Sequence, residues 1–91
     1  MTVNLTPMSI AIDLLEALLG QYRPALDHKD IKDVEEMDAA GEPYYALGFL
    51  LSALYMKGIE VPEEYADKIW SITDPDDVED FTLYLGPRPK T

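Results

Sequence analysis

Apolar residues in the stretch 42–57, EPYYALGFLLSALYMK, recur with the period of an α-helix. Leu47, Leu50, Leu51 and Leu54 have the i, i+3, i+4, i+7 spacing that places side chains on one helical face. The neighbouring face carries a second apolar set and three tyrosines: Ala46, Phe49, Ala53, Met56, Tyr44, Tyr45 and Tyr55. Because a helix that is apolar over most of its circumference must be surrounded by protein, we predict that this segment is the central helix.

The ends of this central helix have their own sequence signals. Pro43 suits the first helical position, where its missing N–H costs nothing, and Gly58 suits a left-handed C-terminal cap. Gly48 and Ser52 are four residues apart and therefore share one face. Their small side chains predict that another helix approaches closely there.

Two further helices are predicted before the central one. The first covers 7–22, with Thr6 as N-cap and Pro7 at the first position. Its inward face comprises Ile10 or Ala11, Leu14, Leu15, Leu18 and Tyr22. The second covers 31–40, with Asp30 as its cap and Gly41 at its end. Its apolar stripe is narrow (Ile31, Val34 and Met37), so it depends on docking to the central helix.

The C-terminal part predicts two more elements. Pro62 opens a helix that runs to about Ile72, with Tyr65, Ile69 and Ile72 inward. A short fifth helix is predicted over 76–85, although the β-propensity of residues 82–84 leaves a strand-like segment as the alternative. The predicted fold is an all-α, small antiparallel helical bundle of four to five helices in a single domain, 1–91. Its ends, 1–5 and 87–91, are expected to be loose.

The charge of the chain narrows its classes of partner. Eighteen acidic residues face seven basic ones, for a formal net charge of -11. Nucleic acid and anionic membranes need a cationic surface, so we expect neither as a direct partner. A basic protein partner would be steered into fast encounter. The plainer interpretation is an ordinary acidic surface, because the sign of the charge bears on association and not on fold.

Catalytic and cofactor chemistry is not signalled. The chain has no cysteine, which excludes disulfides, thiolate zinc sites and cysteine nucleophiles. His28 falls in a predicted loop and is expected to be a surface residue, and no serine has a nucleophile-elbow context. The acidic stretch 74–80 lacks the glycine and glutamate of a calcium loop. Phosphate-loop, dinucleotide, zinc-protease and carrier-protein serine motifs are absent. We therefore predict no enzyme activity, no cofactor and no metal.

Location follows from the N-terminal pattern. The only long apolar run there is interrupted by Asp13 and Glu16, and no basic region precedes it. We therefore predict neither a signal peptide nor a membrane span. The absence of cysteine fits a reducing cytosol, and we expect a cytoplasmic protein.

Recognition is the function class that remains. Acidic residues concentrate on the second predicted helix and at the start of the fourth, and two tyrosines follow the second helix directly. Tyrosine forms hot spots because it buries a large area at little entropic cost. The predicted partner-binding residues are Asp30, Asp33, Glu35, Glu36, Asp38, Tyr44, Tyr45, Glu60, Glu63, Glu64 and Asp67. The alternative is that one tyrosine belongs to the core and the acidic residues only solvate the surface.

A resemblance adds to this hypothesis. The stretch 40–62, AGEPYYALGFLLSALYMKGIEVP, followed by 65–69, YADKI, resembles MafI-like and related small helical immunity proteins of polymorphic and contact-dependent toxin systems. The shared features are a Gly-Glu turn, an Ala-Leu-rich helix ending in Leu-Tyr, a Gly-Ile-x-x-Pro link and a helix with Tyr and Ile. The paired tyrosines are also similar to those of colicin-nuclease immunity proteins, although here they begin a long helix.

The resemblance implies a cytoplasmic, non-enzymatic antitoxin that binds one cognate toxin domain as a heterodimer and covers its active site. Such toxins are often nucleases with basic clefts. Asp33, Glu36 and Glu63 are then expected to pair with toxin lysines and arginines, with Tyr44 or Tyr45 as the central anchor. The alternative, from another class, is an acidic adaptor or regulatory domain that binds a cellular protein and neutralises nothing.

Overall fold

The computed structural model describes residues 6–89, and these residues form α-helices and short 3₁₀ turns without a strand. The helices are α1 (Pro7–Tyr22), α2 (His28–Ala39), α3 (Pro43–Met56), α4 (Glu63–Ile72) and α5 (Val78–Leu85). Two 3₁₀ turns, Arg23–Ala25 and Pro75–Asp77, precede α2 and α5. The predicted all-α bundle is confirmed, and the segment 76–85 is helical instead of strand-like.

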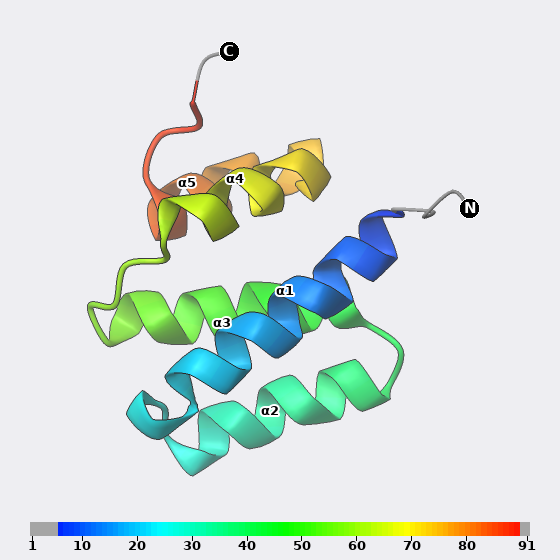
Figure 1. The fold of residues 1–91 in the computed structure, drawn as a ribbon, viewed down its shortest axis with the longest axis vertical. Coiled ribbons are helices and arrows are strands. Elements are labelled where there is room, and N and C mark those ends of the chain that lie inside the picture. Colours follow the sequence, from blue (N-terminus) through cyan, green and yellow to red (C-terminus); the bar gives the residue numbers. More distant parts are fainter. Residues whose placement is uncertain (1–5, 90–91) are drawn as a thin grey trace.

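Helix α3 lies at the centre of the arrangement and packs against α1, α2 and α5, while α4 packs on α1 (Figure 1). Each helix reverses the direction of the one before it, so the bundle is antiparallel along the chain (Figure 1). One consequence is that α3 and α5, which are separated by α4 in the sequence, run in the same direction.

The core is formed by the predicted leucine face of α3. Leu47, Leu50, Leu51 and Leu54 are fully buried. Every other helix contributes apolar side chains to the same cluster, among them Leu14, Leu15 and Leu18 of α1, Ile31 and Val34 of α2, Ile69 and Trp70 of α4, and Phe81 of α5. The i, i+3, i+4 spacing therefore identified the face that is buried.

The start of α1 confirms the predicted cap. The backbone N–H of Ser9 donates to Thr6 Oγ1 at 3.1 Å, and the backbone N–H of Thr6 donates to Ser9 Oγ at 3.0 Å. This reciprocal pair satisfies two backbone donors that a helix leaves free at its N-terminus.

Three predicted helix starts were wrong by one to three residues. Helix α5 begins at Val78, because the preceding residues Pro75–Asp77 form a 3₁₀ turn. Helix α2 begins at His28 with Asp27 as N-cap residue, so Asp30 lies inside its first turn, where the helix dipole favours negative charge. The physical reason is that the 3₁₀ turn ends at Ala25 and the extended backbone of Asp27 lets the helix begin at once. His28 is therefore an exposed helical residue and not a loop residue. Pro62 is likewise the N-cap residue of α4 and not its first helical residue.

The prediction that protein surrounds α3 was also wrong. Four of its large side chains are exposed: Tyr45 (59%), Phe49 (50%), Tyr55 (43%) and Met56 (78%). Three neighbouring helices cover the leucine face and its flanks, and no described element covers the side that remains. The central helix therefore presents an apolar stripe to solvent.

The ends of the chain are described only in part. The expectation for 1–5 and for residues 90 and 91 falls outside the described residues. Within the expected tail, Arg88 Nη2 donates a 3.2 Å hydrogen bond to the carbonyl oxygen of Trp70, and its guanidinium lies 5.4 Å from the centre of the indole ring. No helix within residues 6–89 combines the length and the apolar character needed to cross a membrane.

Candidate binding groove

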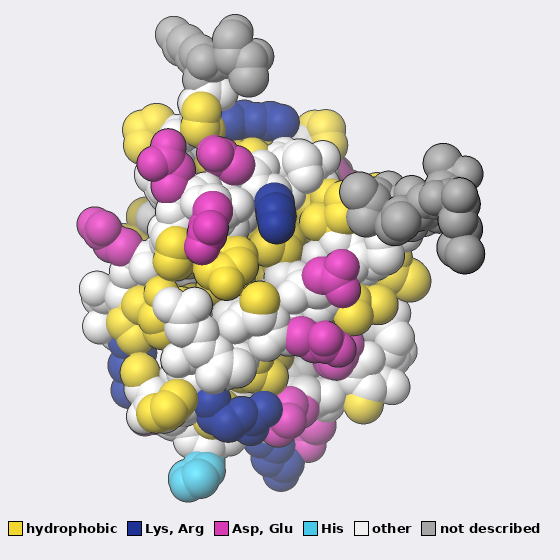
Figure 2. Space-filling model, viewed as in Figure 1, with side chains coloured by type: hydrophobic (Ala, Val, Ile, Leu, Met, Phe, Trp, Pro, Cys, Tyr) yellow, Lys and Arg dark blue, Asp and Glu magenta, His cyan; other side chains and the backbone are white. Residues whose placement is uncertain are grey.

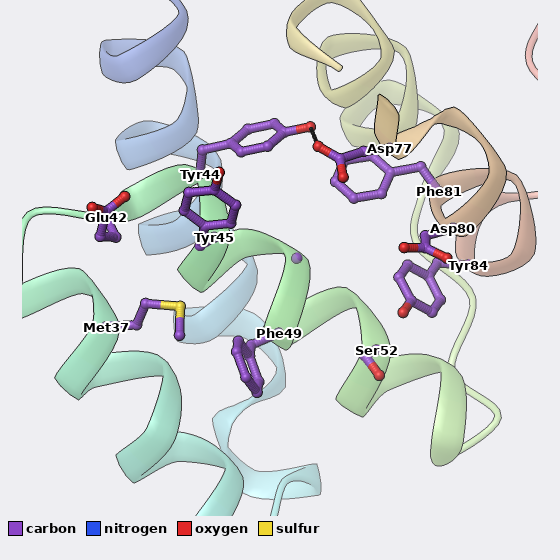
Figure 3. Close-up of a pocket in the computed structure, with 11 residues that line it drawn as sticks. Met37, Glu42, Tyr44, Tyr45, Phe49, Ser52, Asp77, Asp80, Phe81 and Tyr84 are labelled. Atoms are coloured by element: carbon purple, nitrogen blue, oxygen red, sulfur yellow. Dashed lines mark hydrogen bonds between the residues drawn. The ribbon is translucent and has the colours of Figure 1, made fainter. Parts of the chain in front are cut away.

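A groove lies between α3 and α5, and the C-terminal end of α2 borders it (Figure 3). Its volume is about 510 Å³. Helix α1 passes behind α3 in this view, so the groove opens on the side of α3 away from α1 (Figure 3). Aromatic and acidic side chains dominate the lining: Tyr44, Tyr45, Phe49, Phe81 and Tyr84, with Glu42, Asp77 and Asp80.

The α3 wall is built from side chains that recur along one helical face. Tyr45 and Phe49 are one turn apart and at least half exposed. Gly48 and Ser52 lie beside them, and a Cβ atom on Gly48 would come 3.9 Å from Phe81 Cε1. The helix that approaches the small residues of α3 is therefore α5.

The aromatic rings form a connected row across the two helices. Tyr44 stands 5.9 Å from Phe81, Phe81 stands 6.3 Å from Tyr84, and Tyr84 stands 5.8 Å from Tyr55, measured between ring centroids. Tyr45 meets Tyr44 edge to face at 5.7 Å. Aromatic pairs at such distances add stability beyond the burial of their area. The floor of the groove is therefore held in place by packing before any partner arrives.

Tyr44 is part of this supporting structure. Its hydroxyl donates a 2.7 Å hydrogen bond to Asp77 Oδ2 and accepts one from the backbone N–H of Asp74 at 3.1 Å. Burial, together with the hydrogen bond to the Asp77 carboxylate, raises the pKa of Tyr44 to about 12. The phenol is thus protonated at neutral pH and ties the start of α3 to the start of α5. Of the two predicted anchor candidates, Tyr45 is the one whose ring is exposed.

The rim of the groove is acidic. Glu42, Asp77 and Asp80 line it, and none of the ion pairs formed among residues 6–89 includes any of these three carboxylates. The sequence between Glu60 and Asp80 contains nine acidic residues and a single lysine, Lys68. The α5 side of the groove therefore belongs to the most negative part of the chain.

The predicted acidic residues of α2 have a different environment. Asp33 pairs with Lys29 at 3.4 Å, Glu36 with Lys32 at 3.8 Å, and Glu35 with Arg23 at 3.3 Å. These pairs are exposed and contribute little to stability, but they offset much of the negative charge on this helix. Asp30 is half-buried and Asp38 is exposed.

The predicted acidic residues around α4 lie elsewhere. Glu60, Glu63, Glu64 and Asp67 are exposed, but α4 and α2 lie on opposite sides of α1 and α3 (Figure 1). In the same view, acidic side chains gather at the end of the molecule where α4 lies, and lysine and arginine side chains occur among acidic ones at both this end and the α2 end (Figure 2). The structure therefore does not join the two predicted acidic groups into one patch around the tyrosines.

Several groove residues were missed by reasoning from the sequence. Phe49 was assigned to the buried part of the central helix, and Asp77 and Asp80 were considered only as part of an acidic stretch that lacks the pattern of a calcium loop. Tyr84 was assigned to a segment whose structure was left open. The spacing of Asp77, Asp80 and Tyr84, at i, i+3 and i+7, is the signal that places Asp77, the N-cap residue of α5, in line with Asp80 and Tyr84 on one face of that helix.

The groove has the chemistry of binding. It offers aromatic surface and carboxylates, and among residues 6–89 no group of three His, Asp or Glu side chains is placed to hold a metal ion. Comparisons of the chain with protein-family models, with curated proteins and with solved structures found no match.

Proposed function

We propose that this chain is an immunity protein: a non-enzymatic cytoplasmic antitoxin that binds the basic surface of one cognate toxin domain. The observation that carries the proposal is the groove, in which the exposed rings of Tyr45 and Phe49 lie between the carboxylates of Glu42 and Asp80. The resemblance of 40–62 to small helical immunity proteins supplies the biological class.

The exposed rings supply the anchor of such an interface. An exposed apolar patch rimmed by polar groups is typical of a protein interaction site. Tyr45 and Phe49 stand on a helix whose other face is fully buried, so their backbone is already fixed. Binding therefore costs little conformational entropy in the groove. A larger part of the free energy gained by burying apolar area then contributes to affinity.

The carboxylates attract a partner of opposite charge. A net charge of -11 attracts a cationic partner over distances of about the Debye length, roughly 8 Å at physiological salt. Nuclease toxins carry basic clefts because their substrate is a chain of phosphates. An acidic surface that covers such a cleft keeps the nucleic acid out and provides carboxylates in place of its phosphates. The toxin is then inhibited without any catalytic step by the antitoxin. The expected complex is one antitoxin molecule bound to one toxin molecule.

The test is co-expression with the toxin domain encoded beside this gene. Cells that carry the wild-type protein should survive induction of the toxin. A double variant, Tyr45→Ala with Phe49→Ala, should fail to protect them. The matched control is Met8→Ala, because Met8 is as exposed as Tyr45 but lies on α1, outside the groove. Equal death of cells with and without the wild-type protein contradicts the proposal.

An adaptor or regulatory domain is the second candidate, because an aromatic groove with an acidic rim serves any basic partner. It predicts no toxin reading frame next to the gene. It also predicts that the groove variants lose a cellular partner without any change in survival.

A further inference from the structure

We infer that the segment of the partner that occupies the groove is a cationic amphipathic α-helix, whose apolar face meets α3 and whose Lys and Arg edge meets α5. This inference rests on the proposed function and deepens it, because it names the chemistry and the secondary structure of the partner segment.

The secondary structure of the occupant follows from the hydrogen bonds of the walls. The groove is formed by helices, whose mid-helix N–H and C=O groups bond within the same helix. Such walls offer side chains to a partner and no strand edge, so β-augmentation is excluded as the binding mode. A segment that enters an apolar groove must then satisfy its own backbone groups, and a helix does so internally.

The shape of the groove suits a helix laid along it. Tyr44 meets Asp77 at the N-terminal ends of α3 and α5, and Tyr55 meets Tyr84 near their C-terminal ends, so the two walls run side by side. The residues of α3 that line the groove, from Tyr44 to Ser52, span about 12 Å, which matches roughly two turns of a partner helix. A helix of that length brings apolar side chains to the groove at i, i+3, i+4 and i+7.

The two walls differ in charge, and this difference orients the occupant. On the α3 wall, the exposed side chains are the rings of Tyr45 and Phe49. On the α5 wall, Asp77 and Asp80 lie on the same face as Tyr84. A partner helix therefore needs apolar residues toward α3 and cationic residues along the edge toward α5, where cation–π contact with Tyr84 is also available.

A second copy of this chain is a poor occupant. Two copies, each with a net charge of -11, repel one another, and facing grooves would bring Asp77 and Asp80 of one copy toward the same carboxylates of the other. None of the described helices has a cationic edge, because Lys29 and Lys32 of α2 alternate with acidic residues. Charge complementarity therefore selects a basic segment of another protein.

The experiment measures binding of a synthetic peptide to the whole protein. The probe is a fluorescein-labelled peptide of about 16 residues, long enough to cover the stripe as a helix. It carries leucines at i, i+3, i+4 and i+7 and lysines along one edge of that face. We expect saturable binding by anisotropy and a gain in helical circular dichroism on mixing. Phe49→Ala and Asp80→Asn should each weaken binding at least tenfold.

Two control variants and two control peptides make the result specific. Met8→Ala and Asp13→Asn change an exposed apolar and an exposed acidic residue of α1, and neither should alter the affinity. A peptide of the same composition in scrambled order should bind at least tenfold more weakly. A proline-rich basic peptide, which represents a partner segment in an extended conformation, should also bind at least tenfold more weakly.

The inference is overturned if the helical peptide does not bind, if the scrambled or proline-rich peptide binds equally well, or if Phe49→Ala and Asp80→Asn keep full affinity. Failure of this inference can be distinguished from failure of the proposed immunity function. Protection from the toxin by the Phe49→Ala variant would leave an immunity protein that uses another surface. Binding of the peptide without protection from any neighbouring toxin would leave a helix-binding groove in a protein of another class.

Discussion

The hydroxyl of Tyr44 and the carboxylate of Asp77 lie 2.7 Å apart and join residues that are 33 positions apart in the chain. This contact fixes the N-terminal end of α5 against the N-terminal end of α3, and the groove lies between these two helices (Figure 3). The relationship gives the first two predictions.

Replacing Tyr44 by Phe should lower the free energy of unfolding by about 1 to 2 kcal/mol, because it removes a charge-assisted hydrogen bond and the acceptor for the Asp74 N–H. Urea unfolding followed by circular dichroism measures the change. The matched control is Tyr45→Phe. The hydroxyl of Tyr45 makes no hydrogen bond among residues 6–89, so its removal should lower the free energy of unfolding by less than about 0.5 kcal/mol. Equal effects of the two substitutions would contradict the assigned role of Tyr44.

The same bond should make stability fall at alkaline pH. The pKa of Tyr44 is about 12 in the folded protein against an ordinary value of 10.0. Between these values the unfolded chain releases the phenolic proton while the folded protein keeps it, so the free energy of unfolding decreases as pH rises. The contribution is fully present below pH 10 and is lost as pH rises through 12. The difference in stability between wild type and Tyr44→Phe should therefore shrink across this window, and a constant difference would refute the assignment.

Truncation of two adjacent residues of α3 should lower stability by very different amounts. Leu50 is fully buried, so Leu50→Ala should cost about 2 to 5 kcal/mol through the lost burial and the cavity left behind. Phe49 is half exposed, so Phe49→Ala should cost less than about 1 kcal/mol. Thermal and urea unfolding of the two variants measure the contrast. A large loss for Phe49→Ala would mean that this ring belongs to the core and not to a binding surface.

Two glycines should also respond with opposite signs. Gly58 follows α3 with φ of +71°, a left-handed conformation in which a side chain is strained, so Gly58→Ala should cost about 1 kcal/mol. Gly20 lies within α1 with open space around its Cα, so Gly20→Ala should stabilise by about 0.5 to 1 kcal/mol. Melting temperatures of the two variants are the measurement, and a shift in the same direction for both would contradict these backbone conformations.

Arg88 should contribute to the environment of the indole. Arg88→Ala removes the cation–π contact with Trp70 and the hydrogen bond to its carbonyl oxygen, and should cost about 0.5 to 1 kcal/mol. Because Trp70 is the only tryptophan, its fluorescence reports the loss directly as a change in emission. Arg88→Lys keeps the charge but not the planar guanidinium, so it should give an intermediate change. Unaltered emission in Arg88→Ala would show that the contact does not persist in solution.

The fold was predictable because its signals are local. Apolar periodicity, the Thr6 cap, Pro43 at the start of α3 and Gly58 at its end act within one or two turns, and each can be recognised without knowing the neighbours. The start of α2 was missed because Asp27 and Asp30 are the same residue type, and aspartate is favoured at N-cap positions. The choice between them depends on where the chain leaves the preceding 3₁₀ turn, which is a matter of backbone path.

The candidate site was only partly predictable. Tyr45 was predicted to bind a partner from its type and position, and the structure shows that its ring is exposed. Phe49, also exposed, was instead assigned to the buried part of α3 with its other apolar residues. A phenylalanine on an apolar helix has the same pattern whether a neighbouring helix covers it or not. Asp77 and Asp80 could not be connected with Tyr44, because nothing in the sequence states that α3 and α5 lie side by side.

By itself, the sequence determined the helices, the leucine face that forms the core, and the negative net charge. The helices and their buried face depend on the spacing of residues along the chain, because helical hydrogen bonds join residues only four positions apart. The net charge depends on composition alone. Only the tertiary structure decided which side of α3 stays uncovered, which tyrosine is held and which is exposed, and which carboxylates border the groove. Whether a side chain is exposed depends on which elements pack against it, and some of the elements that pack against α3 come from segments distant in the chain.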